Sequence, residues 1–394
     1  MTHIEQMIQA MCPNGVEFKT LGEVCIVKTA PMKLDKKEYQ EEGLYPIVDQ
    51  GQKYIVGYTD NAKALVPADD YVIFGDHTRE IKYVDFTFAQ GADGVKILKT
   101  KNEILPRFLY HVLKNTQIPS RGYNRHWTIA KDIEIPLPPI EIQKKIVECL
   151  DKFSALAAEL QAELQARRKQ YEFYRTQLLT PPQNISFGNS TDDRNWKWKT
   201  LEEIGTFQRG NGLQKKDFTD EGTGCIHYGQ IYTKLGTFCH ETIAKVPNEL
   251  AAKLAKVYTG NLVIACTSEN VEDCCKAVAW LGDETIVTGG HAAVFRHNEN
   301  PKYIAYAFQS EIFQQQKNKF AKGVKVIDIK IEELAKIRIP LPSLEEQARI
   351  VAILDKFEAL TNSISDGIPA EQAAQQKRYE YYRDKLLSFE KKGN

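Results

Sequence analysis

One block of sequence occurs twice in this chain, and this duplication limits what the chain can fold into. The first copy, Ile133–Phe153, is IEIPLPPIEIQKKIVECLDKF, and the second, Ile337–Phe357, is IRIPLPSLEEQARIVAILDKF. A second pair follows, because KQYEFYRTQLL from Lys169 recurs as KRYEYYRDKLL from Lys377, after four more residues in the second copy. Self-similarity of this kind indicates internal duplication. Two copies predict a pseudo-twofold molecule and no solenoid.

Each copy predicts the end of a strand followed by a long helix. Proline cannot continue a strand ladder, so the IPLP sequence ends an extended segment. Apolar residues then recur at heptad spacing, which predicts helices that pack lengthwise on each other. In the second copy, Asp366–Pro369 predicts a kink, or the end of one helix and the start of another. The residues expected to pair the helices are Ile146, Leu150, Phe153, Leu160, Leu164, Tyr171, Tyr174, Ile350, Leu354, Phe357, Ile364, Tyr379, Tyr382 and Leu386.

The remaining sequence predicts two sheet-rich domains with the same order of elements. After a short helix over residues 1–12, alternating apolar residues and Gly/Asp turns predict a curled, mainly antiparallel sheet, followed by a helix at Pro106–Asn115. The second half repeats this order, with a helix at Pro301–Ser310, although its sheet segments differ in sequence. We therefore expect an α+β protein, in which two mixed α/β domains with curled sheets are separated by two long helices.

The expected boundaries follow from these patterns. They are 1–135 for the first sheet domain with its N-terminal helix, 136–180 for the first helical region, 181–195 for a linker rich in turn formers, 196–339 for the second sheet domain, 340–389 for the second helical region and 390–394 for a tail.

Composition restricts the partners and the compartment. The 394 residues include 52 basic and 52 acidic ones, so the formal charge is zero and any nucleic-acid surface must be a local patch. The length suits two or three domains. Eight cysteines form no C-x-x-C pair, and neither a signal peptide nor a long apolar run is visible. We expect a cytoplasmic protein with reduced thiols and no membrane partner.

Two basic, aromatic-containing segments, 121–127 and 317–325, precede the two IPLP sequences in the same frame. Lys and Arg neutralise phosphates, while Arg, Asn and Gln can hydrogen-bond to base edges, so both segments are candidates for DNA contact; solvated loops are the alternative. Polar tips between predicted strands are further candidates, with ordinary hairpin turns as the alternative. The candidate DNA-binding residues are Gln50, Gln52, His77, Thr78, Arg79, Arg121, Tyr123, Asn124, Arg125, Arg209, Lys215, Tyr228, Gln230, Thr267, Ser268, Asn270, Lys319, Lys322 and Lys325.

No motif predicts a catalytic centre. A nuclease pattern of Asp followed by Glu-x-Lys is imitated by Asp69, Asp70, Glu80 and Lys82, although the last part also alternates as an ordinary strand. A metal site is conceivable, with a spacing that fits no familiar zinc pattern, at Cys225, His227, Cys239 and His240. A P-loop, the Asn/Asp-Pro-Pro-aromatic tetrapeptide of adenine methyltransferases and a G-x-S-x-G elbow are missing from the sequence. We expect no catalytic residue and no bound metal.

The doubled IPLP…LDKF block and the doubled K-x-Y-E-[FY]-Y-R…LL ending resemble the specificity (S) subunits of type I restriction–modification systems over essentially the whole chain. GVEFKTLGEV, IFGDHTR, GNGLQKKDF and HYGQIY look like phrases common in such subunits. The resemblance implies two target recognition domains, each for one half of a bipartite DNA site. It also implies that the two helices pair antiparallel and set the spacer between the half-sites.

The resemblance further implies the partners. These are double-stranded DNA, two modification subunits that carry S-adenosylmethionine chemistry on adenine, and restriction subunits that join through them; no cofactor is expected on this chain. Two alternatives remain open: a stand-alone DNA-binding or regulatory protein without methyltransferase partners, and the recognition half of a fused restriction enzyme, which would need catalytic domains that this sequence lacks. A pull-down of a methyltransferase subunit would separate the first alternative from the main interpretation.

Overall fold

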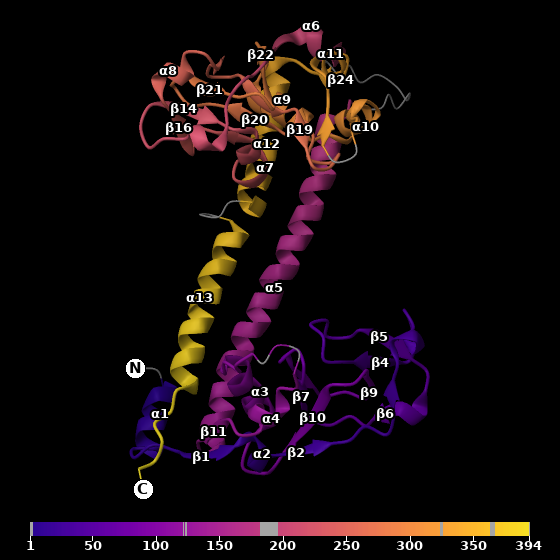
Figure 1. Ribbon diagram of the computed structural model, residues 1–394, viewed down its shortest axis with the longest axis vertical. Helices are drawn as coiled ribbons and strands as arrows, with labels where there is room; N and C mark the ends of the chain where they lie inside the picture. Colours follow the sequence, from indigo (N-terminus) through magenta and orange to yellow (C-terminus); the bar gives the residue numbers. More distant parts are fainter. Residues whose placement is uncertain are drawn as a thin grey trace, which may run out of the picture. The chain divides into compact units, whose positions relative to one another are not determined.

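The chain divides into two compact units in the computed structural model, which describes residues 3–120, 122, 124–181, 196–323, 326–362 and 367–393. The first unit is Met1–Ala162 with Ala370–Asn394, and the second unit is Glu163–Pro369. Figure 1 colours the elements along the sequence. Helix α5 (Ile140–Leu179) has 40 residues and contributes to both units, so each unit combines one sheet-rich domain with part of the long helices.

The first unit contains a four-stranded antiparallel sheet and a five-stranded mixed sheet. Its strands are β1 Glu17–Thr20, β2 Cys25–Lys28, β3 Lys33–Leu34, β4 Tyr45–Val48, β5 Gly57–Thr59, β6 Leu65–Val66, β7 Tyr71–Gly75, β8 Ile81–Val84, β9 Phe88–Gly91, β10 Val95–Thr100 and β11 Glu134–Leu137. The antiparallel sheet has the order β2-β10-β7-β8. The other has the order β3-β9-β4-β5, with β6 also on β9, and here β3 and β4 run parallel to β9. The expectation of a mainly antiparallel sheet therefore holds for the first sheet, while the second contains parallel pairs.

The first unit also contains helices. They are α1 His3–Met11, α2 Leu21–Val24, α3 Pro106–Asn115, α4 Trp127–Ala130, the first part of α5, and most of α13 Ile368–Leu387, with 3-10 turns η1 Lys36–Glu38 and η2 Ala62–Ala64. Proline at the first position of α3 fits a helix start, since its missing N–H has no partner there in any case. Both α1 and α3 confirm the helices expected from the sequence.

The second unit contains a five-stranded and a four-stranded sheet. Its strands are β12 Lys197–Thr200, β13 Gly205–Arg209, β14 Thr223–Ile226, β15 Phe238–Cys239, β16 Ala244–Val246, β17 Ala255–Val257, β18 Leu262–Ala265, β19 Thr267–Ser268, β20 Ala277–Trp280, β21 Ile286–Thr288, β22 Ala292–His297, β23 Ile327–Asp328 and β24 Arg338–Leu341. The sheets have the orders β13-β22-β18-β20-β15 and β16-β14-β21-β17, and β19 pairs with β23.

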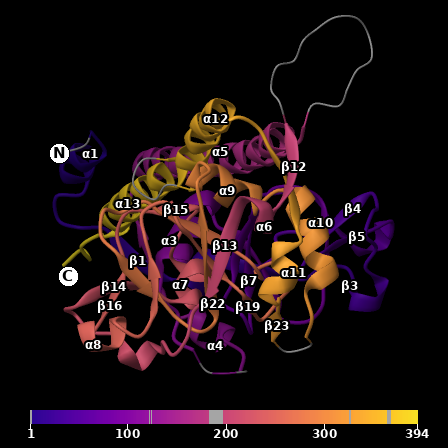
Figure 2. The ribbon, with the colours of Figure 1, turned by 90° about the horizontal axis from the view of Figure 1, so that it is seen from above.

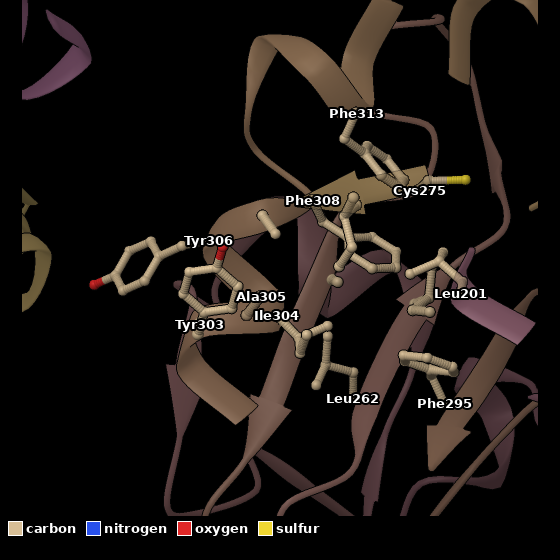
Figure 3. Close-up of a cluster of buried hydrophobic side chains, with 14 of the residues drawn as sticks. Leu201, Leu262, Cys275, Phe295, Tyr303, Ile304, Ala305, Tyr306, Phe308 and Phe313 are labelled. Carbon is tan, nitrogen blue, oxygen red and sulfur yellow. The ribbon is translucent and has the colours of Figure 1, made fainter. Parts of the chain in front are cut away.

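The helices of the second unit are α6 Leu201–Ile204, α7 Tyr228–Thr233, α8 Asn248–Ala251, α9 Pro301–Ala307, α10 Glu311–Phe320, α11 Ile331–Ala335, α12 Leu344–Asn362 and the end of α5, with the 3-10 turn η3 Lys215–Asp217. Helices α10 and α11 lie side by side (Figure 2). Figure 3 shows the main core, where Tyr303 and Ile304 of α9 cluster with Leu262 of β18 and Phe295 of β22. Burial of such large apolar side chains provides the main stabilising free energy of the unit.

One strand order underlies both units although their sheet sequences differ. The run β2-β10-β7-β8 corresponds to β13-β22-β18-β20, and all neighbouring strands in these two runs are antiparallel. The second sheets agree as well, because β4 and β9 run parallel, as do β14 and β21. The strand pairs β1–β11 and β12–β24 close the two domains in the same register. The duplication therefore includes the sheet domains and not only the helices.

The long helices pair within each unit. In the first unit Phe153 stacks on Tyr382 with 5.6 Å between ring centroids, and Gln161 accepts a hydrogen bond from Gln372 at 3.0 Å. Higher residue numbers on α5 pair with lower residue numbers on α13, so these two helices are antiparallel in the first unit. In the second unit, Phe357 of α12 stacks on Tyr174 of α5 at 5.3 Å. Among the described residues, none of the helices combines the length and apolar character of a membrane span.

The predicted pairing residues contribute unequally. Buried members are Ile146, Leu150, Leu160, Leu164, Tyr171, Ile350, Leu354 and Leu386. Phe153, Phe357, Tyr379 and Tyr382 are half-buried, Tyr174 is more exposed but stacked, and Ile364 lies outside the described residues. The second copy is interrupted between α12 and α13, with Pro369 in the first turn of α13, so one helix ends and another begins.

A buried glutamine in each repeated block fixes the long helix to its sheet domain. Gln143 accepts a hydrogen bond from Leu105 N at 2.8 Å and donates to Pro138 O at 2.8 Å. Its counterpart Gln347 accepts from Asn300 N at 3.0 Å and donates to Pro342 O at 3.0 Å. The bonds that the two glutamines accept join the start of a long helix to the residue that precedes a proline-initiated helix. This helix is α3 in the first unit and α9 in the second. The recurrence of glutamine in the duplicated block thus has a structural cause.

A repeated aspartate makes the second attachment. Asp151 accepts from Arg107 Nε at 3.0 Å and contacts His111 Nε2 at 2.8 Å, both on α3. In the second unit Asp355 accepts from Lys302 Nζ at 2.7 Å and from the Tyr306 hydroxyl at 2.8 Å, both on α9. The same two acceptor positions therefore fix both domains, although the donors differ.

We expect Gln347→Ala to destabilise the second unit by about 2–4 kcal/mol, because it leaves a buried N–H and a buried carbonyl without partners. Chemical denaturation should show the loss as a lower unfolding midpoint. Gln315→Ala is the control, since Gln315 is exposed on α10 and bonds only Glu311. Equal midpoints for the two variants would contradict the role given to Gln347.

Candidate functional site

In the first unit, Asp76 joins the turn after β7 to the predicted basic segment. Asp76 is 1% exposed, and its backbone N–H donates to Gly94 O at 2.7 Å. Its carbonyl accepts from His126 N at 2.7 Å, and its carboxylate accepts from Trp127 N at 2.7 Å. The turn Gly75–Arg79 and the segment around His126, which the sequence suggested separately, therefore lie together.

Gln50, which follows β4, completes this arrangement. Its Oε1 accepts from His77 N at 3.0 Å, and its Nε2 donates to Asp93 O at 2.8 Å. The hydroxyl of Thr78 donates to the backbone carbonyl of Gln50. The side-chain amide of Gln50 is thus used to hold the turn, which gives this residue a positioning role.

The side chains on the outer side of this turn are polar and mostly exposed. The exposed candidates are Gln52, Thr78, Arg79, Asn124 and Arg125, and His77 is half-buried. Arg79 has a positive φ of 63°. Its Nη1 donates to Ile118 O at 2.9 Å, and the residue lines a cleft of about 730 Å³ beside the end of α3. The bond and charge of Lys33, with smaller contributions from Arg125 and His77, lower the pKa of Asp93. Arg121 and Tyr123 lie outside the described residues.

In the second unit, five candidates line one groove of about 460 Å³ at the start of α7, which we call the α7 groove. They are Lys215, Tyr228, Thr267, Ser268 and Asn270. Tyr228 stands between His227 and His291, with centroid separations of 4.4 and 4.9 Å. Burial, followed by the charges of Lys215 and His291, lowers the pKa of His227. Since His227 Nδ1 also accepts from Gly229 N at 3.2 Å, a neutral ring fits this position.

Strand β23, which follows the basic segment of the second unit, lies beside the same groove. Thr267 and Ser268 of β19 pair with Asp328 and Ile327 of β23, and the exposed Val326 lines the groove. The loop after β18 and the segment before the second IPLP are thus adjacent, as in the first unit. Both sheet domains bring their two candidate regions together.

Lys317 fits neither the DNA contact predicted for the basic segment nor the alternative of a solvated loop. It belongs to α10, is 0% exposed and donates to Val271 O at 2.7 Å and Glu272 O at 3.2 Å. Burial lowers the pKa of its ammonium. Lys319 and Lys322 are exposed and do not line the α7 groove, and Lys325 lies outside the described residues. Part of the basic segment therefore supports the fold.

Two other candidates also contact the protein itself. Gln230 is buried and accepts from His227 N at 2.8 Å, within the first turn of α7. Arg209 donates to the Asp328 carboxylate at 3.0 Å, which ties β13 to β23. These contacts give both residues structural roles beside the groove.

The residues of the nuclease-like pattern have separate partners. Lys82 is buried, and it donates to Asp49 O at 2.8 Å and Lys53 O at 2.6 Å; burial lowers its pKa. Glu80 instead accepts from Lys114 at 2.6 Å. A nuclease centre would need these groups around one ion, so the arrangement contradicts that alternative.

The conceivable cysteine–histidine metal site is likewise divided between sheets, since Cys225 is in β14 and Cys239 in β15. Within the described ranges, no group of three or more His, Cys, Asp or Glu side chains could hold a metal ion. All eight cysteines are free thiols.

Several residues of these surfaces were not among the candidates, although Asp76 and Glu269 stand in the polar tips that the sequence indicated. Glu269, Asp273 and His291 line the α7 groove, and Asp76 organises the opposite domain's turn. The one weak sequence signal for His291 is the Gly289-Gly290 pair before it. The structure gives a reason for this glycine, because a Cβ at Gly289 would lie 2.2 Å from the Leu213 side chain. The others stand in turns whose long-range partners sequence spacing does not reveal.

Residues 13–167 and 193–372 match the type I restriction modification DNA specificity domain family. The EcoR124I/EcoR124II type I restriction enzyme specificity subunit of Escherichia coli is 31% identical over 408 residues, which cover 99% of this chain and 98% of that protein. A putative type I restriction enzyme specificity subunit of Haemophilus influenzae, S.HindORF215P, is 30% identical over 420 residues and covers 98% of each chain.

Solved structures share the fold at low sequence identity. The crystal structure of a type I restriction–modification system S subunit from M. genitalium has a TM-score of 0.61 at 15% identity, covering 95% of this chain and 96% of that chain. A chain from a structure of the type I R-M system has a TM-score of 0.53 at 17% identity, covering 95% and 98%. These similarities support two mixed domains combined with long helices.

Proposed function

Because the chain belongs to the type I restriction modification DNA specificity domain family and matches it in both halves, we propose that each of its two recognition domains binds one half of a bipartite DNA site. The observation that supports this most directly is the repeated strand order with different loop chemistry. The turn after β7 presents Thr78 and Arg79, whereas the loop after β18 presents Glu269 and Asn270. One scaffold with two such surfaces suits an asymmetric target.

The chain is a specificity subunit of a type I restriction–modification system, and it carries no catalytic role. We propose that double-stranded DNA binds to both domains, and that two modification subunits dock on the helices and bring restriction subunits with them. S-adenosylmethionine then belongs to the modification subunits. The relatives described above support this subunit function and not the stand-alone regulatory alternative.

The duplicated ending supports two copies of one partner. Phe173 of α5 and Tyr381 of α13 occupy matching positions in KQYEFYR and KRYEYYR, and they are 60% and 58% exposed. Aromatic side chains are enriched at the centres of protein interfaces, where their burial contributes strongly to affinity. Two equivalent exposed aromatics fit two copies of the same modification subunit.

Reconstitution tests this function. We expect the purified chain with S-adenosylmethionine and DNA to show no methyl transfer, because the catalytic groups are on the partner. Adding the modification subunit of the same system should produce adenine methylation at a split site, measured by sequencing the modified DNA. Modification subunits alone serve as the control. Turnover by the chain alone, or the same methylated sites without the chain, would refute the proposal.

A further inference from the structure

The loop from β18 to β20 is held in one conformation by contacts within the protein. Asn270 Oδ1 accepts from Asp273 N at 2.7 Å, and the Ser268 hydroxyl donates to the Asn270 carbonyl. The Tyr232 hydroxyl of α7 donates to the Thr267 carbonyl, and Lys317 holds the far side of the loop. The backbone at the tip of such a loop is held in place before any ligand binds.

Glu269 occupies this tip. It is exposed and lines the α7 groove, and no hydrogen bond or ion pair joins it to the part of the chain that the structure describes. The neighbouring acid Asp273 differs, since it pairs with Lys276 at 2.7 Å and accepts from Asn270 Nδ2 at 2.8 Å. The carboxylate of Glu269 is therefore available to a ligand.

A free carboxylate in a DNA-binding groove restricts the groups it can contact. Phosphates repel it, whereas Lys215, in the same groove, suits a phosphate. The exocyclic amino groups of cytosine and adenine are hydrogen-bond donors in the major groove, and a carboxylate accepts from them. A carboxylate in this groove therefore favours sequences that place an amino group beside it, and it lowers the affinity for sequences that do not.

We propose that Glu269 reads an exocyclic amino group, of cytosine or adenine, in the half-site bound by the second unit, and that Lys215 positions a phosphate of the same half-site. This inference rests on the proposed function. It assigns Glu269 and Lys215 to different parts of the DNA, so substitutions of these two residues have different signatures.

The test uses the complete complex with modification subunits and a DNA library varied at each position of the second half-site. We expect Glu269→Ala to reduce discrimination about 5- to 150-fold at one position only. Glu269→Gln should shift that position toward adenine, because an amide can bond adenine N6 and N7 together. Glu221→Ala is the control: Glu221 is an exposed acid of the same unit outside the groove, and its removal should leave every preference unchanged.

Lys215→Ala should instead weaken binding to all targets equally and reduce the slope of log affinity against log salt by about 0.9. If Glu269→Ala leaves discrimination unchanged at every position, or changes the affinity for all targets equally, the role given to Glu269 is wrong. That result would not contradict the proposed function. Thermal unfolding at the wild-type midpoint shows that the variant is folded. A wild-type complex that methylates no split site would overturn the proposed function, and this inference with it.

Discussion

Replacement of residues 196–341 by the corresponding domain of another specificity subunit is expected to change one half of the methylated site completely and to leave the other half unaltered. These residues include β12 and β24, so the strand pair that closes the second recognition domain stays together. The second domain has its own sheets, and its largest hydrophobic cluster also includes residues of α5 and α12, all of them in the second unit. Its replacement should therefore leave the first domain's turn around Asp76 intact.

Sequencing of methylated DNA from cells that carry the hybrid subunit would measure this result. The reciprocal control replaces residues 13–137, bounded by β1 and β11, and should change only the other half-site. If either exchange alters both half-sites, the two domains do not recognise DNA separately.

Insertion of one heptad between Ala162 and Glu163, with a second at Gly367 to match it, is expected to lengthen the spacer between unchanged half-sites. The first site lies where the two units divide along α5, so contacts inside each unit are kept. Seven residues extend a helix by about 10 Å, roughly three base-pair rises, and turn its face by only about 20°. The spacer could grow less, because DNA bends and twists at modest cost.

Mapping of methylated sites would measure the spacer. An insertion of two residues at Ala162 is the control, since it rotates the helix face by about 200° and should disrupt pairing and assembly. An active heptad variant that keeps the original spacer would show that the helices do not set it.

Local sequence rules predicted the helices closely. Proline at the first position located α3, and heptad spacing after IPLP located α5 from Ile140. Pro369 marked the start of α13, because a proline fits the first turn of a helix and not its interior. Such signals lie within a few residues of the feature they predict, so sequence alone can reveal them.

Features that depend on residues far apart in the chain were harder to predict from the sequence. The parallel pairing of β4 with β9 joins segments far apart in the chain, and so does the pairing of β19 with β23. Lys317 looked like a surface cation, yet its ammonium satisfies two carbonyls of a loop that no local pattern connects to it. The repeated glutamines were visible, but their bonds to Leu105 and Asn300 N–H groups were not.

The central claim is that this chain alone determines a bipartite DNA target, one half for each recognition domain. The most direct measurement is methylome sequencing of cells that contain the complete system, compared with cells in which only this chain is removed. We predict methylated adenines in two specific half-sites separated by a nonspecific spacer of constant length, all lost without the chain. A single continuous motif, or a pattern that persists after removal, would contradict the account.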